Sequence, residues 1–176
     1  MGMNAQGALI GLGLQYYALG RCAAFAGSIP ITGCLLHNAI ERFLKGYLIK
    51  SASLEKLKDK YGHDLNKLWE AFKDGTGDSS LARLDGVIKG LDKFEPLRYP
   101  NSVLEQGINC TIGVQRFTLA KNADRTEPVY SLFLDEIDDL AKTIVELVPN
   151  YNPKASIVIT NRLRELLKED NEWQLF

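Results

Sequence analysis

The most regular helical pattern in the chain is LLHNAIERFLKGYL, residues 35–48. Its apolar side chains recur every three or four residues, which is the spacing of one face of an α-helix. Pro30 precedes the run and suits the first turn of a helix, so we expect a long, largely buried helix that reaches Lys50. The apolar positions are Leu35, Leu36, Ala39, Ile40, Phe43, Leu44, Tyr47 and Leu48.

The segment before this helix is almost uncharged, since Arg21 is the only charged residue within 1–36. A signal peptide needs a basic start, and a membrane span needs about 20 strongly apolar residues, so this polar and glycine-interrupted run fits neither. We expect a buried helix, in which the small residues Gly13 and Gly20 let a neighbouring helix approach closely. The spacing predicts a packed face made of Leu9, Leu12, Tyr16, Leu19 and Ala23.

Further amphipathic segments follow along the chain. Two glycines within residues 74–78 are unfavourable in a helix interior and end the third helix. The patterns predict a short helix within 51–62, a helix that begins at His63-Asp64, a helix over 81–91, a closing segment over 94–101, a helix over 129–148 and a last helix over 155–168.

Residues 108–114 break the helical pattern, because apolar and polar residues alternate there with the period of a half-buried strand. This strand either pairs with residues 117–120 or remains an extended excursion. We therefore predict an all-α, antiparallel helical bundle of about five to seven helices, with a small β excursion near 107–121. The length of 176 residues suits one domain, residues 1–176, with core motifs in 16–100 and closing helices in 129–170.

Charge and cysteine content restrict the function classes. Lys and Arg total 21, Asp and Glu total 22, and the net charge is −1. The chain therefore carries no global basic field that would attract nucleic acid or anionic lipid. Three widely separated cysteines fit neither a disulfide framework nor a thiolate zinc site, so we expect a protein of the reducing cytoplasm. Because the N-terminal run does not fit a membrane span, we expect no membrane segment.

Ionisable side chains gather on the strongest predicted helix, where His37, Glu41 and Lys45 are spaced four residues apart and share one stripe. Such a stripe is either a set of surface pairs worth a few tenths of a kcal/mol each or a group of ionisable side chains in a cleft. His63 and Asp64 lie at a predicted helix start, where helix capping explains them more simply than catalysis does. No metal-ligand spacing is present.

Two other segments hold candidate polar groups. Arg98 and Tyr99 precede a proline, so a rigid corner could present a guanidinium and a phenol, or could simply hold this loop against the bundle. The acidic run over residues 135–139 resembles a metal cluster, but its pattern favours a solvated helix face.

The order of these motifs resembles the HEPN family of small helical domains, which are linked to nucleotidyltransferases, toxin–antitoxin pairs and phage defence. The resemblance covers roughly the first hundred residues, and residues 129–148 would correspond to the closing helix. The motifs are YYALGRCAA at 16–24, LHNAIERFLKGYL at 36–48, YGHDL at 61–65 and LRYP at 97–100.

The resemblance implies an antiparallel bundle that forms a homodimer and places polar residues around a shared cleft. Nuclease members carry an Arg followed four to six residues later by a His, and neither His37 nor His63 has such an Arg before it. The resemblance therefore implies a sensing or binding member without enzymatic activity, metal or cofactor.

Three functions remain open from the sequence. The first is a non-enzymatic domain that binds a small ligand, a nucleotide or RNA, or a partner protein. The second is a metal-independent RNase toxin, in which His37 or His63 is the general base and Arg42 or Arg98 stabilises charge. The third is a structural partner of a nucleotidyltransferase. The cleft in the first case would be lined by His37, Glu41, Lys45, His63, Asp64, Arg98 and Tyr99.

Overall fold

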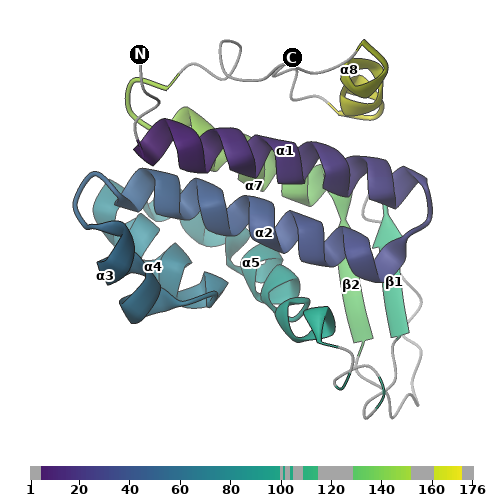
Figure 1. The fold of residues 1–176 in the computed structure, drawn as a ribbon, viewed down its shortest axis with the longest axis horizontal. Coiled ribbons are helices and arrows are strands. Elements are labelled where there is room, and N and C mark those ends of the chain that lie inside the picture. The colour runs from purple at the N-terminus through teal and green to yellow at the C-terminus, as the bar shows by residue number, and fades with distance from the viewer. Residues whose placement is uncertain are drawn as a thin grey trace.

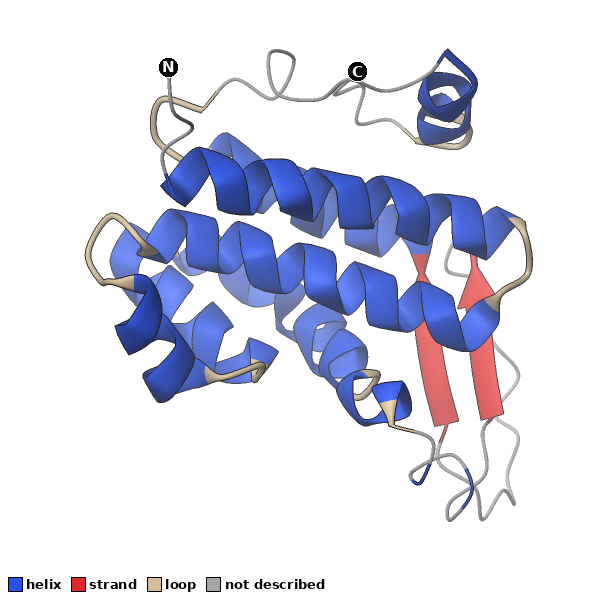
Figure 2. Cartoon of the chain, in the orientation of Figure 1, coloured by secondary structure: helices blue, strands red, loops and turns tan. Residues whose placement is uncertain are grey.

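The computed structural model describes residues 5–99, 101, 104, 109–114, 129–151 and 161–171, and it is mostly helical (Figures 1 and 2). The predicted helical bundle with a small β excursion is confirmed. Its helices are α1 (Ala5–Phe25), α2 (Ile29–Leu48), α3 (Leu54–Tyr61), α4 (Leu65–Thr76), α5 (Asp85–Asp92), α7 (Leu134–Glu146) and α8 (Asn161–Lys168). The 3₁₀ turns η1 (Ser79–Leu84) and η2 (Glu95–Arg98) flank α5, and the strands are β1 (Asn109–Gly113) and β2 (Val129–Phe133).

Helices α1 and α2 form a closely packed antiparallel pair, which Figure 1 shows running side by side. Glycines make this approach possible, as the small residues in the sequence predict. A Cβ at Gly13 would lie 2.6 Å from Phe43 Cε1, and a Cβ at Gly20 would lie 2.6 Å from Leu36 Cδ2. Side chains of α2 can therefore pack directly on the backbone of α1 only because these positions carry no side chain.

The predicted packed face of α1 is wrong. Leu12 and Leu19 are 42% and 53% exposed, whereas Ile10, Leu14 and Tyr17 are fully buried. Apolar residues occupy both sides of this helix, so their spacing alone cannot select the inner one. The glycines that contact α2 decide which side faces the bundle.

The predicted helix over 129–148 is also wrong at its start. Residues 129–133 form strand β2, which pairs in parallel with β1, in a register from Asn109 opposite Val129 to Gly113 opposite Phe133. Helix α7 begins only at Leu134, and Asp135 and Glu136 in its first turn suit the positive end of the helix dipole. A short apolar run fits a strand as well as a helix, which explains the error.

The other predicted elements are confirmed with adjusted ends. The helix expected from His63-Asp64 starts at Leu65, with Asp64 as its N-cap, and ends at Thr76 before Gly77 in the left-handed conformation. The helix expected over 81–91 is divided between η1 and α5. The strand expected at 108–114 occupies 109–113, whereas its proposed partner at 117–120 and the start of the last helix at 155–160 lie outside the described residues.

Helix α2 lies at the centre of the fold and contacts α1, α4, α5, α7, η2 and β1. Its buried aromatic side chains join a cluster in which Tyr47 meets Phe72 edge-on and Trp69 stacks on Phe72. Within the described residues, no helix is long and apolar enough to cross a membrane.

A buried polar network joins α1 to α7 and to the end of α8. The guanidinium of Arg21 is fully buried, pairs with the carboxylate of Asp138 and donates to the carbonyl of Glu169. Tyr17 donates to Asp138 at 2.6 Å, and Asn171 donates to Tyr17 at 3.0 Å.

The expectation of a fully solvated acidic face on α7 is therefore wrong at Asp138, which is 5% exposed. Burial raises the pKa of this carboxyl, although Arg21 and Tyr17 act in the opposite direction. Asp138 faces the interior because it shares one face of α7 with the buried Leu134 and Ala141, and because it pairs there with the buried Arg21.

Candidate functional site

The carboxylate of Glu41 brings together residues from α2 and from the turn between α3 and α4. Lys45 Nζ lies 2.7 Å from Glu41 Oε1 and donates a second hydrogen bond of 2.6 Å to the carbonyl of Gly62. His63 Nδ1 lies 3.0 Å from Glu41 Oε2. Two residues of the predicted helical stripe, Glu41 and Lys45, therefore form one cluster with His63 of the predicted turn, and Glu41 is at its centre.

The turn between α3 and α4 places His63 in this position. Gly62 ends α3 with a positive φ of 55°, a conformation that glycine adopts without strain. Asp64 then caps α4 by accepting a hydrogen bond of 2.9 Å from the backbone of Lys67, as predicted for a helix start. His63 lies between the C-cap of α3 at Gly62 and the N-cap of α4 at Asp64, and its imidazole projects toward Glu41.

Electrostatics around Glu41 determine which His63 nitrogen is available. Burial would raise the pKa of Glu41, but the hydrogen bonds and charges of Lys45 and His63 outweigh it and hold that pKa below 4.5. An ionised carboxylate can only accept, so His63 Nδ1 carries the hydrogen of this contact. In the neutral ring Nε2 is then left as an acceptor, on a side chain that is 55% exposed.

His37 does not join the Glu41 cluster. Its ring is fully buried, and neither nitrogen has a hydrogen-bond partner in the part of the chain that the structure describes. Nε2 lies 3.7 Å from Asp92 Oδ1, too far for a hydrogen bond but close enough for an electrostatic contact. Asp92 accepts from the backbone of Leu65 at 2.9 Å and from Asn66 at 2.6 Å. Burial would raise the pKa of Asp92, but His37 and these donors lower it, so the carboxyl is ionised.

The arginines and the tyrosine expected at the site have other contacts. Arg98 pairs with Glu95. Tyr99 is 56% exposed, with the Arg98 guanidinium 5.8 Å from its ring centroid. Arg42 binds the carbonyl and side chain of Asn38 and lies 4.4 Å above the ring of Tyr16 on α1. Neither Arg42 nor Tyr99 lines a pocket beside His63.

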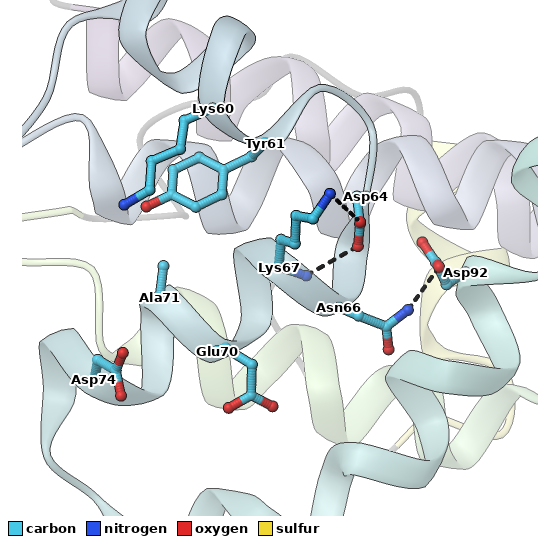
Figure 3. A pocket seen from close by; sticks show the side chains of 9 residues that line it. All are labelled: Lys60, Tyr61, Asp64, Asn66, Lys67, Glu70, Ala71, Asp74 and Asp92. Atoms are coloured by element: carbon cyan, nitrogen blue, oxygen red, sulfur yellow. Dashed lines mark hydrogen bonds and ion pairs between the residues drawn. The ribbon is translucent and has the colours of Figure 1, made fainter.

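Two pockets adjoin at Asp64 and Asp92, which line both. The smaller pocket, of about 270 Å³, is lined by His63, Asp64, Asp92, Glu95 and Pro96. The larger pocket, of about 480 Å³, lies along α4 and the end of α3 (Figure 3). Besides the shared aspartates, its lining residues are Lys60, Tyr61, Asn66, Lys67, Glu70, Ala71 and Asp74.

Sequence reasoning missed Asp92 and Glu95, although both line the pocket beside His63. Neither belongs to a motif, and they reach His63 only because α5 and η2 pack against α2 and α4. Among the described residues, no group of three His, Cys, Asp or Glu side chains is arranged to hold a metal ion. Comparison with family models, curated proteins and solved structures finds no match for this chain.

Proposed function

We propose that this chain is a non-enzymatic binding domain whose pocket beside His63 takes a positively charged, hydrogen-bond-donating group such as a primary ammonium. The orientation of His63 by Glu41 carries the proposal, because in the neutral ring it leaves Nε2 as an acceptor on a side chain that lines the pocket. The resemblance to HEPN domains, the homodimer and the nucleotidyltransferase partner stay predictions.

The other polar side chains that line the pocket are carboxylates, which also accept hydrogen bonds. Asp64, Asp92 and Glu95 line it together with His63, and no lysine or arginine among the described residues lines it. An ammonium group could donate to Nε2 and to a carboxylate at once, and charge-assisted hydrogen bonds are the stronger kind. Among the ligands expected from the sequence, nucleotide and RNA suit this pocket least, because their phosphates would face carboxylates.

Calorimetric titration with butylamine, with butyrate as the anionic counterpart, tests the proposal. We expect butylamine to bind, weakly and less so at high salt, and butyrate not to bind. Replacing His63 with Ala removes one acceptor for the ammonium group and should weaken binding by about tenfold, since a hydrogen bond to a charged group contributes about 1.5 kcal/mol.

The matched control is Tyr99→Ala, which truncates an exposed side chain close in sequence to the pocket but outside its lining. Its butylamine affinity should equal that of the unmodified protein. Absence of butylamine binding, or equal loss in both variants, would contradict the proposal.

A metal-independent RNase is the second candidate, and the same Glu41–His63 contact favours it. A carboxylate that holds Nδ1 orients an imidazole so that Nε2 can remove a proton, which is how general bases are positioned.

Defined single-stranded and structured RNAs, incubated with and without chelator, test this candidate. Cleavage must persist in chelator, disappear in His63→Ala and survive in His37→Ala, because His37 is buried away from the pocket. Cleavage that survives His63→Ala would exclude this mechanism.

A further inference from the structure

The two adjoining pockets present negative charge along α4, from Asp92 at one end to Asp74 at the other (Figure 3). Among the described residues, five carboxylates line their combined surface, against the two lysines Lys60 and Lys67. We infer that the ligand is a linear polyamine of the spermidine type, with one ammonium group beside His63 and Asp92 and another beside Asp74. This inference rests on the proposed function and names the ligand class of that site.

Asp92 is one of the two residues that line both pockets, and it remains anionic. Its oxygens accept from the Leu65 backbone and from Asn66, and Nε2 of the fully buried His37 lies 3.7 Å from Oδ1. Both His37 nitrogens lack a hydrogen-bond partner among the described residues, so this imidazole does not neutralise Asp92 through a direct hydrogen bond. The carboxylate therefore retains charge to offer a cation in either pocket.

Asp74 supplies the second anionic position. It is exposed on the last turn of α4 and has no ion-pair partner among the described residues. Glu70, one turn earlier, already contacts Lys73 at 3.0 Å, and Asp64 contacts Lys67 at 3.1 Å. Of the carboxylates that line the larger pocket, Asp74 is thus the one whose charge is least neutralised by neighbouring side chains.

The wall between the two positions suits a methylene chain. Tyr61 and Ala71 line the larger pocket on the side toward Asp74, and Lys67 and Asn66 lie between them and Asp92 (Figure 3). The face of the Tyr61 ring accepts a cation, because Lys60 Nζ lies 4.9 Å from its centroid. The rise of an α-helix places Asn66 and Asp74 about 12 Å apart, which a long polyamine can span and a short diamine cannot.

Calorimetric titration with butylamine, putrescine, spermidine and spermine tests the inference. Spermidine should bind about fivefold more tightly than butylamine, the factor that one additional exposed ion pair contributes. Putrescine should resemble butylamine, because it is too short to reach Asp74. The Asp74→Asn variant should lower spermidine affinity to that of butylamine and leave butylamine affinity unchanged.

Asp59→Asn is the matched control, since Asp59 is exposed on α3, makes the same charge change and lines neither pocket. It should leave the preference for spermidine intact. Lys60→Ala removes a competing cation from the ring of Tyr61 and should strengthen spermidine binding about twofold, whereas an anionic ligand would be weakened.

The outcomes separate the two proposals. Equal affinity for butylamine and spermidine, unchanged by Asp74→Asn, would overturn the polyamine inference and leave the single-cation pocket standing. Absence of binding by every amine would overturn both. A lysine-rich peptide that binds more tightly than spermidine, and loses this advantage in Asp74→Asn, would identify a protein partner and overturn the polyamine assignment.

Discussion

The charge of Glu41 is the residue-scale feature on which the candidate site depends. Its side chain is only 5% exposed, and an ionised carboxylate at such a position is stable only with partners. Lys45 supplies a cation and His63 supplies a ring hydrogen. The same two contacts that stabilise the carboxylate also set the orientation of the imidazole.

Replacing Lys45 with Met should cost about 2 kcal/mol of unfolding free energy, because it leaves a buried carboxylate without its cation. The control is Lys67→Met, which removes the cation of an exposed pair with Asp64 and should cost less than about 0.5 kcal/mol. Urea denaturation of both variants at neutral pH measures the difference, and equal costs would contradict the structural account.

The pH dependence of stability provides a second test of Glu41. Because folding lowers the pKa of Glu41, its ionised form contributes stability that is fully present above pH 4.5 and is lost as pH falls through the folded-state pKa. The gap in melting temperature between the unmodified protein and Glu41→Gln should therefore be constant near neutrality and narrow below pH 4.5. A gap that does not change with pH would show that the charge is not stabilised.

At the scale of elements, the packing of a side chain directly on a helix backbone determines which residues reach the site. A Cβ added at Gly33 of α2 would lie 1.9 Å from Phe94 Cδ1, so the segment that joins α5 to η2 packs directly on the backbone of α2. Glu95 follows Phe94 and reaches the pocket as a consequence of this contact.

Gly33→Ala should destabilise the protein by about 2 kcal/mol, because a buried aromatic ring must move to admit the methyl group. Gly86→Ala is the matched control, since Gly86 also lies in a helix but has open space around its added Cβ. That change should stabilise the protein by about 0.5 kcal/mol, through the lower flexibility of the unfolded chain. Opposite shifts in melting temperature are expected, and shifts of the same sign would argue against this packing.

At the scale of the whole molecule, the Arg21–Asp138 pair connects segments from both ends of the chain. Arg21 lies in α1, Asp138 in α7, and Arg21 also binds the carbonyl of Glu169 just after α8. The pair is buried, so its main effect is on the arrangement of these helices, and breaking one side leaves a charge without water or partner.

Asp138→Asn should cost about 3 kcal/mol of unfolding free energy, because it leaves the guanidinium of Arg21 buried and unpaired. Asp139→Asn removes the neighbouring carboxylate, which forms an exposed pair with Arg83, and should cost less than about 1 kcal/mol. The double variant Arg21→Met, Asp138→Leu should recover much of the loss. A double-mutant cycle of Arg21→Met, Asp138→Leu and their double variant, measured in urea, gives the coupling, and additive costs would contradict the proposed pairing.

Much of this architecture could be predicted because local pattern controls it. The spacing in residues 35–48 specifies α2, the capping residue Asp64 specifies the start of α4, and Gly13 and Gly20 indicate close helix packing. The four-residue spacing of Glu41 and Lys45 placed both on one stripe before any tertiary contact was known. These features depend on neighbours within a few residues.

The amino-acid sequence by itself determined the helical class, the centre of the bundle and part of the ionisable cluster, because helix periodicity and capping are local. Only the tertiary structure decided the inner face of α1, the strand at 129–133 and the contact of His63 with Glu41. It also placed Asp92 and Glu95 beside His63 and turned Asp138 toward Arg21. Each of these depends on segments distant in the chain, whose packing and desolvation are absent from any local pattern.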